Sequence, residues 1–125
     1  MRIAVKVMDG MYGHAAEGIR VRLERAGDNG WTAVASAQTD SAGRIKDWIG
    51  RCLESGLYRI VFDSDSYFAG LGASTAYPEV LVVFRMQSES DTCQVQLTLS
   101  PYSYSTHFGA ERRLCSRRPG GVRQW

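Results

Sequence analysis

Short segments in which apolar and polar side chains alternate recur along most of this chain and constrain its fold more than any other feature. In residues 3–9, for example, Ile3, Val5 and Val7 share one face, and Lys6 and Met8 share the other. A period of two is typical of a β-strand with one buried face. The same reasoning predicts strands at residues 18–25, 31–37, 57–62, 78–86, 93–100 and 102–108.

Turn-forming residues separate these segments, with clusters at residues 26–30, 39–43 and 88–92. Short strands that recur about every ten residues predict an all-β fold, a sandwich of two antiparallel sheets. Apolar residues recur at the spacing of a helix only in residues 44–55. This pattern predicts either a helix with one apolar stripe or an extended segment with a short helix. A second short helix is predicted at residues 67–71, after possible N-caps at residues 63–66.

The composition is that of one globular domain. The chain has 125 residues, of which 44% are hydrophobic and 22% charged, and this excludes a disordered chain or a coiled coil. No apolar run approaches the ~18 residues of a membrane span, so we expect no membrane association. Lys6 lies where a secretory signal would be apolar, and a cytoplasmic location is therefore the expectation.

The formal net charge of +2 comes from the C-terminal end of the chain. Residues 111–125 contain five arginines and one acidic residue, which leaves residues 1–110 with ten basic and twelve acidic residues. We therefore expect a sandwich domain over residues 1–110 and an arginine-rich extension over residues 111–125. The extension is either a solubilising tail or a contact for an acidic surface. The body has no basic stripe interleaved with aromatic residues, so no nucleic-acid partner is expected.

Cysteine usage points to neither a metal site nor a disulfide framework. The three residues Cys52, Cys93 and Cys115 are odd in number, and no spacing matches a metal-ligand pair. Free or buried thiols are the expectation, and no metal or other cofactor is predicted. A catalytic thiol would require a nearby activating group that spacing alone does not reveal.

An uncharged polar row is predicted on one face of the strand at residues 93–100, formed by Gln94, Gln96 and Thr98. Amide and hydroxyl groups of this kind either orient a small polar ligand or simply face solvent. His107 shares a face with Ser105 on the last strand and is a candidate general base. His14, the other histidine, lies in the first turn region, and either histidine is equally compatible with a plain surface role.

Several segments of the chain resemble the transthyretin and 5-hydroxyisourate hydrolase family. The most specific is residues 99–106 (LSPYSYST), which is similar to the last hairpin of that family. Residues 5–9, 39–44, 56–68 and 77–80 resemble other family segments in the same order, so that the resemblance covers residues 3–110. It implies an eight-stranded antiparallel sandwich with one short helix. It also implies a homotetramer, a dimer of dimers, whose central channel holds a small molecule.

The catalytic set that the resemblance would carry over is mostly replaced. The two histidines of the hydrolases fall on Lys6 and Gln94, whereas their arginine is retained as Arg44. Their closing Tyr-Arg-Gly-Ser falls on residues 107–110, where only Gly109 matches. Glutamine does not transfer protons near neutral pH, so a two-histidine centre cannot be rebuilt here. The small apolar groups of the transthyretin channel are also missing, because polar residues stand at the matching positions.

We therefore expect an enzyme that has diverged from the 5-hydroxyisourate hydrolases. Its substrate would be a small, polar heterocycle, and the reaction a ring opening, a hydration or a cyclisation; the changed catalytic set suggests a biosynthetic role. His107 would transfer the proton, and Lys6 and Arg44 would stabilise negative charge. The predicted substrate-binding residues are Met8, Gln94, Gln96, Thr98 and Ser105. Two alternatives remain: a transthyretin-like binding protein without catalysis, and a 5-hydroxyisourate hydrolase with an altered catalytic set.

Overall fold

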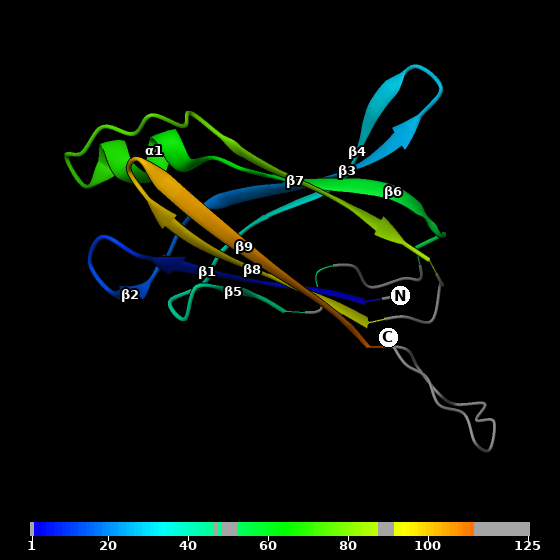
Figure 1. Ribbon diagram of the computed structural model, residues 1–125, viewed down its shortest axis with the longest axis horizontal. Coiled ribbons are helices and arrows are strands. Elements are labelled where there is room, and N and C mark those ends of the chain that lie inside the picture. The colour runs from blue at the N-terminus through cyan, green and yellow to red at the C-terminus, as the bar shows by residue number, and fades with distance from the viewer. Residues whose placement is uncertain (1, 47, 49–52, 88–91, 112–125) are drawn as a thin grey trace.

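Two β-sheets pack face to face in the computed structural model, which describes all residues except 1, 47, 49–52, 88–91 and 112–125 (Figure 1). The first sheet, sheet A, has the order β2-β1-β8-β9, with β5 pairing to β1. Its strands are β1 (Arg2–Asp9), β2 (His14–Ala15), β5 (Arg44–Ile45), β8 (Thr92–Ser100) and β9 (Ser103–Glu111). The second sheet, sheet B, has the order β4-β3-β6-β7. Its strands are β3 (Arg20–Gly27), β4 (Gly30–Gln38), β6 (Gly56–Phe62) and β7 (Val80–Met86).

The core lies between the sheets and is built from the apolar positions of the alternating segments. Ile3, Val5 and Val7 of β1 are at most 1% exposed, and together with equally buried residues of the neighbouring strand β8 they form one cluster with buried residues of β3 and β6 from sheet B. Tyr58, Phe62 and Phe68 are the largest fully buried side chains. The period-two pattern therefore predicted the core faces of β1, β3 and β8 correctly, because burial of one face of a strand is what produces that pattern.

The single helix of the described residues, α1 (Ser64–Gly70), connects β6 to β7 at one end of the sandwich (Figure 1). Asp63 caps it by accepting a hydrogen bond from the Ser66 N–H at 3.1 Å. Phe68 anchors the helix in the core. The capping residues predicted a helix here correctly, although it begins three residues before the predicted range.

Of the two alternatives for residues 44–55, the described residues exclude a continuous helix, and the expectation of wholly antiparallel sheets was wrong for one ladder. The start of the predicted helical segment, Arg44 and Ile45, is strand β5, because the Lys6–Arg44 and Val5–Ile45 pairs extend the ladder of β1. Trp48, Leu53 and Glu54 also lie outside any helix, and the other positions of that stripe, 49 and 52, lie outside the described residues. In addition, β1 pairs with β8 in parallel, whereas the other ladders of the described chain are antiparallel. Parallel pairing is possible because a long connection, not a hairpin, joins these strands.

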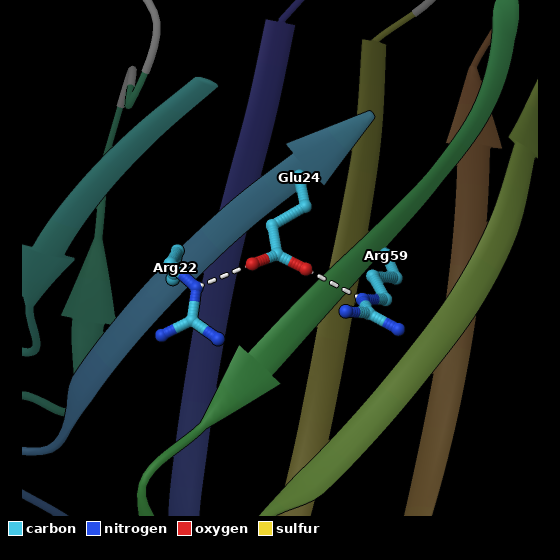
Figure 2. A network of polar contacts seen from close by, with 3 residues as sticks. All are labelled: Arg22, Glu24 and Arg59. Atoms are coloured by element: carbon cyan, nitrogen blue, oxygen red, sulfur yellow. Dashed lines mark hydrogen bonds and ion pairs between the residues drawn. The ribbon is translucent and has the colours of Figure 1, made fainter. Parts of the chain in front are cut away.

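A buried carboxylate holds together the outer face of sheet B (Figure 2). Glu24 is 7% exposed and accepts hydrogen bonds from Arg22 Nε and Arg59 Nε, each at 2.6 Å. The Arg59 guanidinium also lies over the Trp31 ring, 4.4 Å from its centroid. Burial raises the pKa of Glu24, but the bonds and charges of the two arginines outweigh this and lower it below its ordinary value. Glu24 is therefore ionised at neutral pH.

Replacing Glu24 with glutamine is expected to lower the free energy of unfolding by about 1–3 kcal/mol at neutral pH. The pKa of Glu24 is lowered on folding, so its contribution is present above the unfolded value and is lost as pH falls through the folded value. The difference between the wild type and Glu24→Gln should thus shrink below about pH 4.5. Urea unfolding between pH 3 and 8 measures it, with exposed Glu17→Gln as the control. An equal difference across that whole pH range would contradict the assignment.

Candidate functional site

A transverse row of polar side chains crosses the outer face of sheet A. Strand register pairs Arg44 with Lys6, Lys6 with Gln96, and Gln96 with His107. Directly paired residues point to the same face of a sheet, and Val5, Val95 and Ile45, the neighbours in sequence, point into the core. The row therefore spans four strands, about 14 Å, on the side away from the core. We refer to Arg44, Lys6, Gln96 and His107 as the cationic row.

Two flanking rows complete this face. On one side Met8 pairs with Thr98, and Thr98 with Ser105; on the other side Gln94 pairs with Ala4 and Gly109. The structure thus brings all eight predicted site residues to one sheet face, although the sequence separates them by up to about a hundred positions. Alternation alone was sufficient to place each side chain on a face, but only the strand order shows that these faces are the same.

His107, the histidine of the cationic row, lies on β9, an edge strand of sheet A. Strand β9 pairs with β8 on one side, and Thr106 donates a hydrogen bond to the Gln96 carbonyl oxygen at 3.1 Å. Phe108, on the opposite face of β9, packs against Phe84 of sheet B with ring centroids 5.4 Å apart. These contacts direct His107 outward, beside Gln96. His14, by contrast, stacks on Tyr12 at the β1–β2 turn and does not join the row.

A tight turn places Arg44 next to Lys6. Asp40 accepts hydrogen bonds from the backbone N–H groups of Ala42 and Arg44, both at 2.9 Å. The bond from Arg44 lowers the pKa of Asp40, and the opposing effect of burial is smaller. Gly43 has a φ of 75°, and its carbonyl oxygen accepts the Val7 N–H at 2.8 Å. The sequence identified this turn, but not that Asp40 and Gly43 fix the position of Arg44.

Asp9, at the end of β1 and next to Met8, is the centre of a group of partly buried hydrogen bonds. Asp9 is 1% exposed and accepts hydrogen bonds from the Tyr67 hydroxyl at 2.6 Å and from the backbone N–H groups of Met11 and Tyr12. Burial and the bond to Asp9 raise the pKa of Tyr67, which therefore remains a neutral donor. This arrangement ties the β1–β2 turn to α1.

Replacing Tyr67 with phenylalanine is expected to destabilise the fold by about 1–2 kcal/mol, because one oxygen of a buried carboxylate loses its partner. Thermal unfolding measures the change. Tyr102→Phe is the matched control, since the Tyr102 side chain is 72% exposed. Equal melting temperatures for the two variants would show that the Tyr67–Asp9 bond contributes nothing measurable.

The described part of the chain offers no site for a metal ion. No group of three or more His, Cys, Asp or Glu side chains gathers there with the geometry to bind one. Cys93 is buried in the core, whereas positions 52 and 115 lie outside the described residues. None of the helices in the described part combines the length and the apolar character that crossing a membrane requires. The polar functional groups that the predicted site residues present on the outer face of sheet A are thus cations, amides, hydroxyls and one imidazole.

Fold and site together define a two-sheet β-sandwich that carries a cationic row on one outer face. The family model described as "HIUase/Transthyretin family" matches residues 3–109. This chain therefore belongs to that family. Among its curated relatives is the 5-hydroxyisourate hydrolase of Salmonella dublin, 37% identical over 109 residues that cover 86% of this chain and 80% of that protein. The mouse (Mus musculus) 5-hydroxyisourate hydrolase is 32% identical over 111 residues, which cover 86% of this chain and 94% of the mouse protein.

Solved structures show the same fold. Transthyretin from Sparus aurata superposes with a TM-score of 0.83 at 28% identity, covering 88% of this chain and 97% of that one. The 5-hydroxyisourate hydrolase of Klebsiella pneumoniae gives a TM-score of 0.78 at 24% identity, covering 87% and 99%. The resemblance stated from the sequence is therefore confirmed, as is the predicted sandwich. The roles of the eight site residues stay predictions.

Proposed function

We propose that this protein is a hydrolase related to the 5-hydroxyisourate hydrolases and that it opens the ring of a small, polar heterocycle at the outer face of sheet A. The observation that carries the proposal is the cationic row, in which two cations, an amide and an imidazole share one face. Hydrolysis of a cyclic amide requires a proton carrier and positive charge near the developing oxyanion, and the row contains both. The curated relatives named 5-hydroxyisourate hydrolase support the same reaction type.

The reaction that these residues can perform is addition of water to a ring carbonyl group. His107 accepts a proton from water as its oxygen bonds to the carbonyl carbon. Lys6 and Arg44 stabilise the negative charge that develops on the carbonyl oxygen. The carbon–nitrogen bond then breaks, and His107 returns the proton to the leaving nitrogen. Gln94 and Gln96 orient the ring by hydrogen bonds, and Met8, Thr98 and Ser105 form the adjoining wall.

The active assembly in this proposal is a homotetramer, a dimer of dimers in which the outer faces of two A sheets enclose a channel. Strand β9 is one edge of sheet A, and strand β7 is one edge of sheet B, where Leu81 and Val83 are exposed. Edges of this kind are protected when they pair with another strand. Pairing of β9 with a second copy would place two cationic rows side by side. Light scattering after gel filtration should give about four times the chain mass of 13.9 kDa.

The decisive experiment adds the protein to freshly generated 5-hydroxyisourate and follows the decay of its ultraviolet absorbance. Decay faster than in buffer would identify 5-hydroxyisourate as a substrate of this protein, despite its altered catalytic residues. A parallel panel of cyclic ureides and lactams tests the diverged substrate that we favour. If every compound in both assays decays at the buffer rate, the hydrolase proposal is wrong.

The second candidate function is binding of a small anion without catalysis. Lys6 favours it, because this half-buried cation stands where the resemblance places a catalytic histidine of the hydrolases. The polar side chains beside it would suit a polar ligand better than an apolar one. A rise in melting temperature with a compound that is not consumed would support this candidate, and turnover of that compound would exclude it.

A further inference from the structure

A recess lies on the side of the molecule opposite the cationic row, on the outer face of sheet B. It is a groove of about 590 Å³, which falls within the size range of small-molecule sites. Its polar lining residues come from strands β3 and β4 and from the segments next to β6 and β7, and they are Arg20, Arg22, Ser36, Gln38, Asp63 and Glu79. None of these residues belongs to the face that carries the cationic row.

Positive and negative side chains line opposite sides of this groove. Arg20 and Arg22 lie on β3, and their register partners on β4 are Gln38 and Ser36. The two carboxylates lie on the other side: Asp63 follows β6, and Glu79 precedes β7. The Asp63 N–H donates to the Arg20 carbonyl oxygen at 3.0 Å, so this carboxylate is level with Arg20. One wall of the groove is therefore cationic with amide and hydroxyl groups, and the other wall is anionic.

These opposite charges do not neutralise each other directly. In the described part of the chain, neither Arg20 nor Glu79 forms an ion pair, and the Asp63 carboxylate accepts a hydrogen bond only from the Ser66 N–H. Solvated charges facing each other across a groove are available to a ligand that carries both signs. A purely anionic ligand would satisfy the arginines but would be repelled by the two carboxylates.

Arg22 is held in place before any ligand arrives. Its Nε is bound to Glu24, which is bound in turn to Arg59, and Arg59 is fixed by its position over Trp31. Figure 2 shows the two terminal nitrogens of Arg22 pointing away from Glu24, so they are not used by this network. A surface arginine normally loses rotamer freedom when it binds an anion. Because Arg22 is already ordered, part of that entropic cost is removed.

We propose that this groove is a second binding site, specific for a small zwitterion whose carboxylate and ammonium groups are separated by a few bonds. The carboxylate binds between Arg20 and Arg22, with Ser36 and Gln38 supplying hydrogen bonds. The ammonium group lies against Asp63 and Glu79. The site is independent of the proposed hydrolase activity, because the two faces belong to different sheets.

Three four-carbon probes that differ only in their end groups test this site: 4-aminobutyrate, succinate and 1,4-diaminobutane. Each is titrated into the full-length protein while the backbone amide and arginine Nε–H signals are followed by NMR. We expect 4-aminobutyrate to shift the Nε–H signal of Arg22 and the amide signals near Arg20 and Asp63. Succinate and 1,4-diaminobutane should bind at least about tenfold more weakly, since each places a like charge against one wall.

Single substitutions then test how much each wall of the groove contributes to binding. Arg20→Gln and Glu79→Gln should each weaken binding of 4-aminobutyrate about tenfold, and neither residue supports the fold through an ion pair. Arg85→Gln removes an exposed arginine of sheet B outside the groove and should leave binding unchanged. The proposal is overturned if no probe shifts these signals. It is equally overturned if succinate binds as tightly as 4-aminobutyrate, or if Arg85→Gln is as damaging as Arg20→Gln.

Discussion

Replacement of His107 by alanine is expected to lower kcat for ring opening by about 10²- to 10⁴-fold, because it removes the only imidazole of the cationic row. The fold should be unaffected, since this side chain is exposed. Turnover of whichever heterocycle proves active in the substrate panel is the measurement. Added imidazole should restore part of the rate in the alanine variant, because a free base can then occupy the space that His107 leaves.

His14→Ala is the matched control, since it removes the other histidine, which lies at the β1–β2 turn. Its kcat should equal that of the wild type. Lys6→Gln should reduce turnover while Lys6→Arg retains a part of it, if Lys6 acts as a positive charge. If Lys6→Arg is instead as inactive as Lys6→Gln, then the amine itself takes part in the chemistry. Unchanged turnover of His107→Ala would refute the assignment of His107 as the base.

Replacement of Gly43 by alanine is expected to lower the free energy of unfolding by about 2–4 kcal/mol. A Cβ at this position would lie 2.4 Å from the Val7 carbonyl oxygen and 3.1 Å from the Ala15 Cβ, and the φ of 75° disfavours any side chain. The turn must move, and with it the hydrogen bond that ties Gly43 to Val7. Since Arg44 follows directly, turnover should also fall.

Gly13→Ala is the control for the backbone contribution. Gly13 has nearly the same φ, 77°, but a Cβ there would meet no atom within 4 Å. Its cost should be only about 1 kcal/mol, the cost of the left-handed conformation alone. Urea unfolding of both variants separates conformational strain from steric overlap. Equal destabilisation by the two substitutions would show that the turn at Gly43 accommodates the added Cβ without a steric cost.

Strands such as β1 and β8 could be predicted from the sequence because each has one buried face, and burial leaves a visible period of two. The sequence could not predict strand order, because order depends on which exposed backbone edges meet in three dimensions. Residues 44 and 45 illustrate the limit: their apolar neighbours recur at helical spacing, yet pairing to β1 makes them a strand. A two-residue strand is too short to leave a periodic signal of its own.

The candidate site was accessible from the sequence only in part. Alternation placed Lys6, Gln96 and His107 on outward faces, and the family resemblance suggested that these faces converge. The network of Arg22, Glu24 and Arg59 left a weaker signal, because Arg59 lies 35 positions from Glu24 and only the β3–β6 ladder brings them together. From the sequence alone, Glu24 beside the outward Arg22 is indistinguishable from an ordinary solvated strand face.

The parallel ladder between β1 and β8 has a consequence for how the protein is made. Lys6 leaves the ribosome ninety residues before Gln96, its partner in the ladder. Sheet B lies wholly between residues 20 and 86, so that all of its strands are available while β1 still has no β8 to pair with. The cationic row can therefore be completed only after β8 and β9 have been made, and a nascent chain stalled before that point contains all four strands of sheet B but lacks Gln96 and His107.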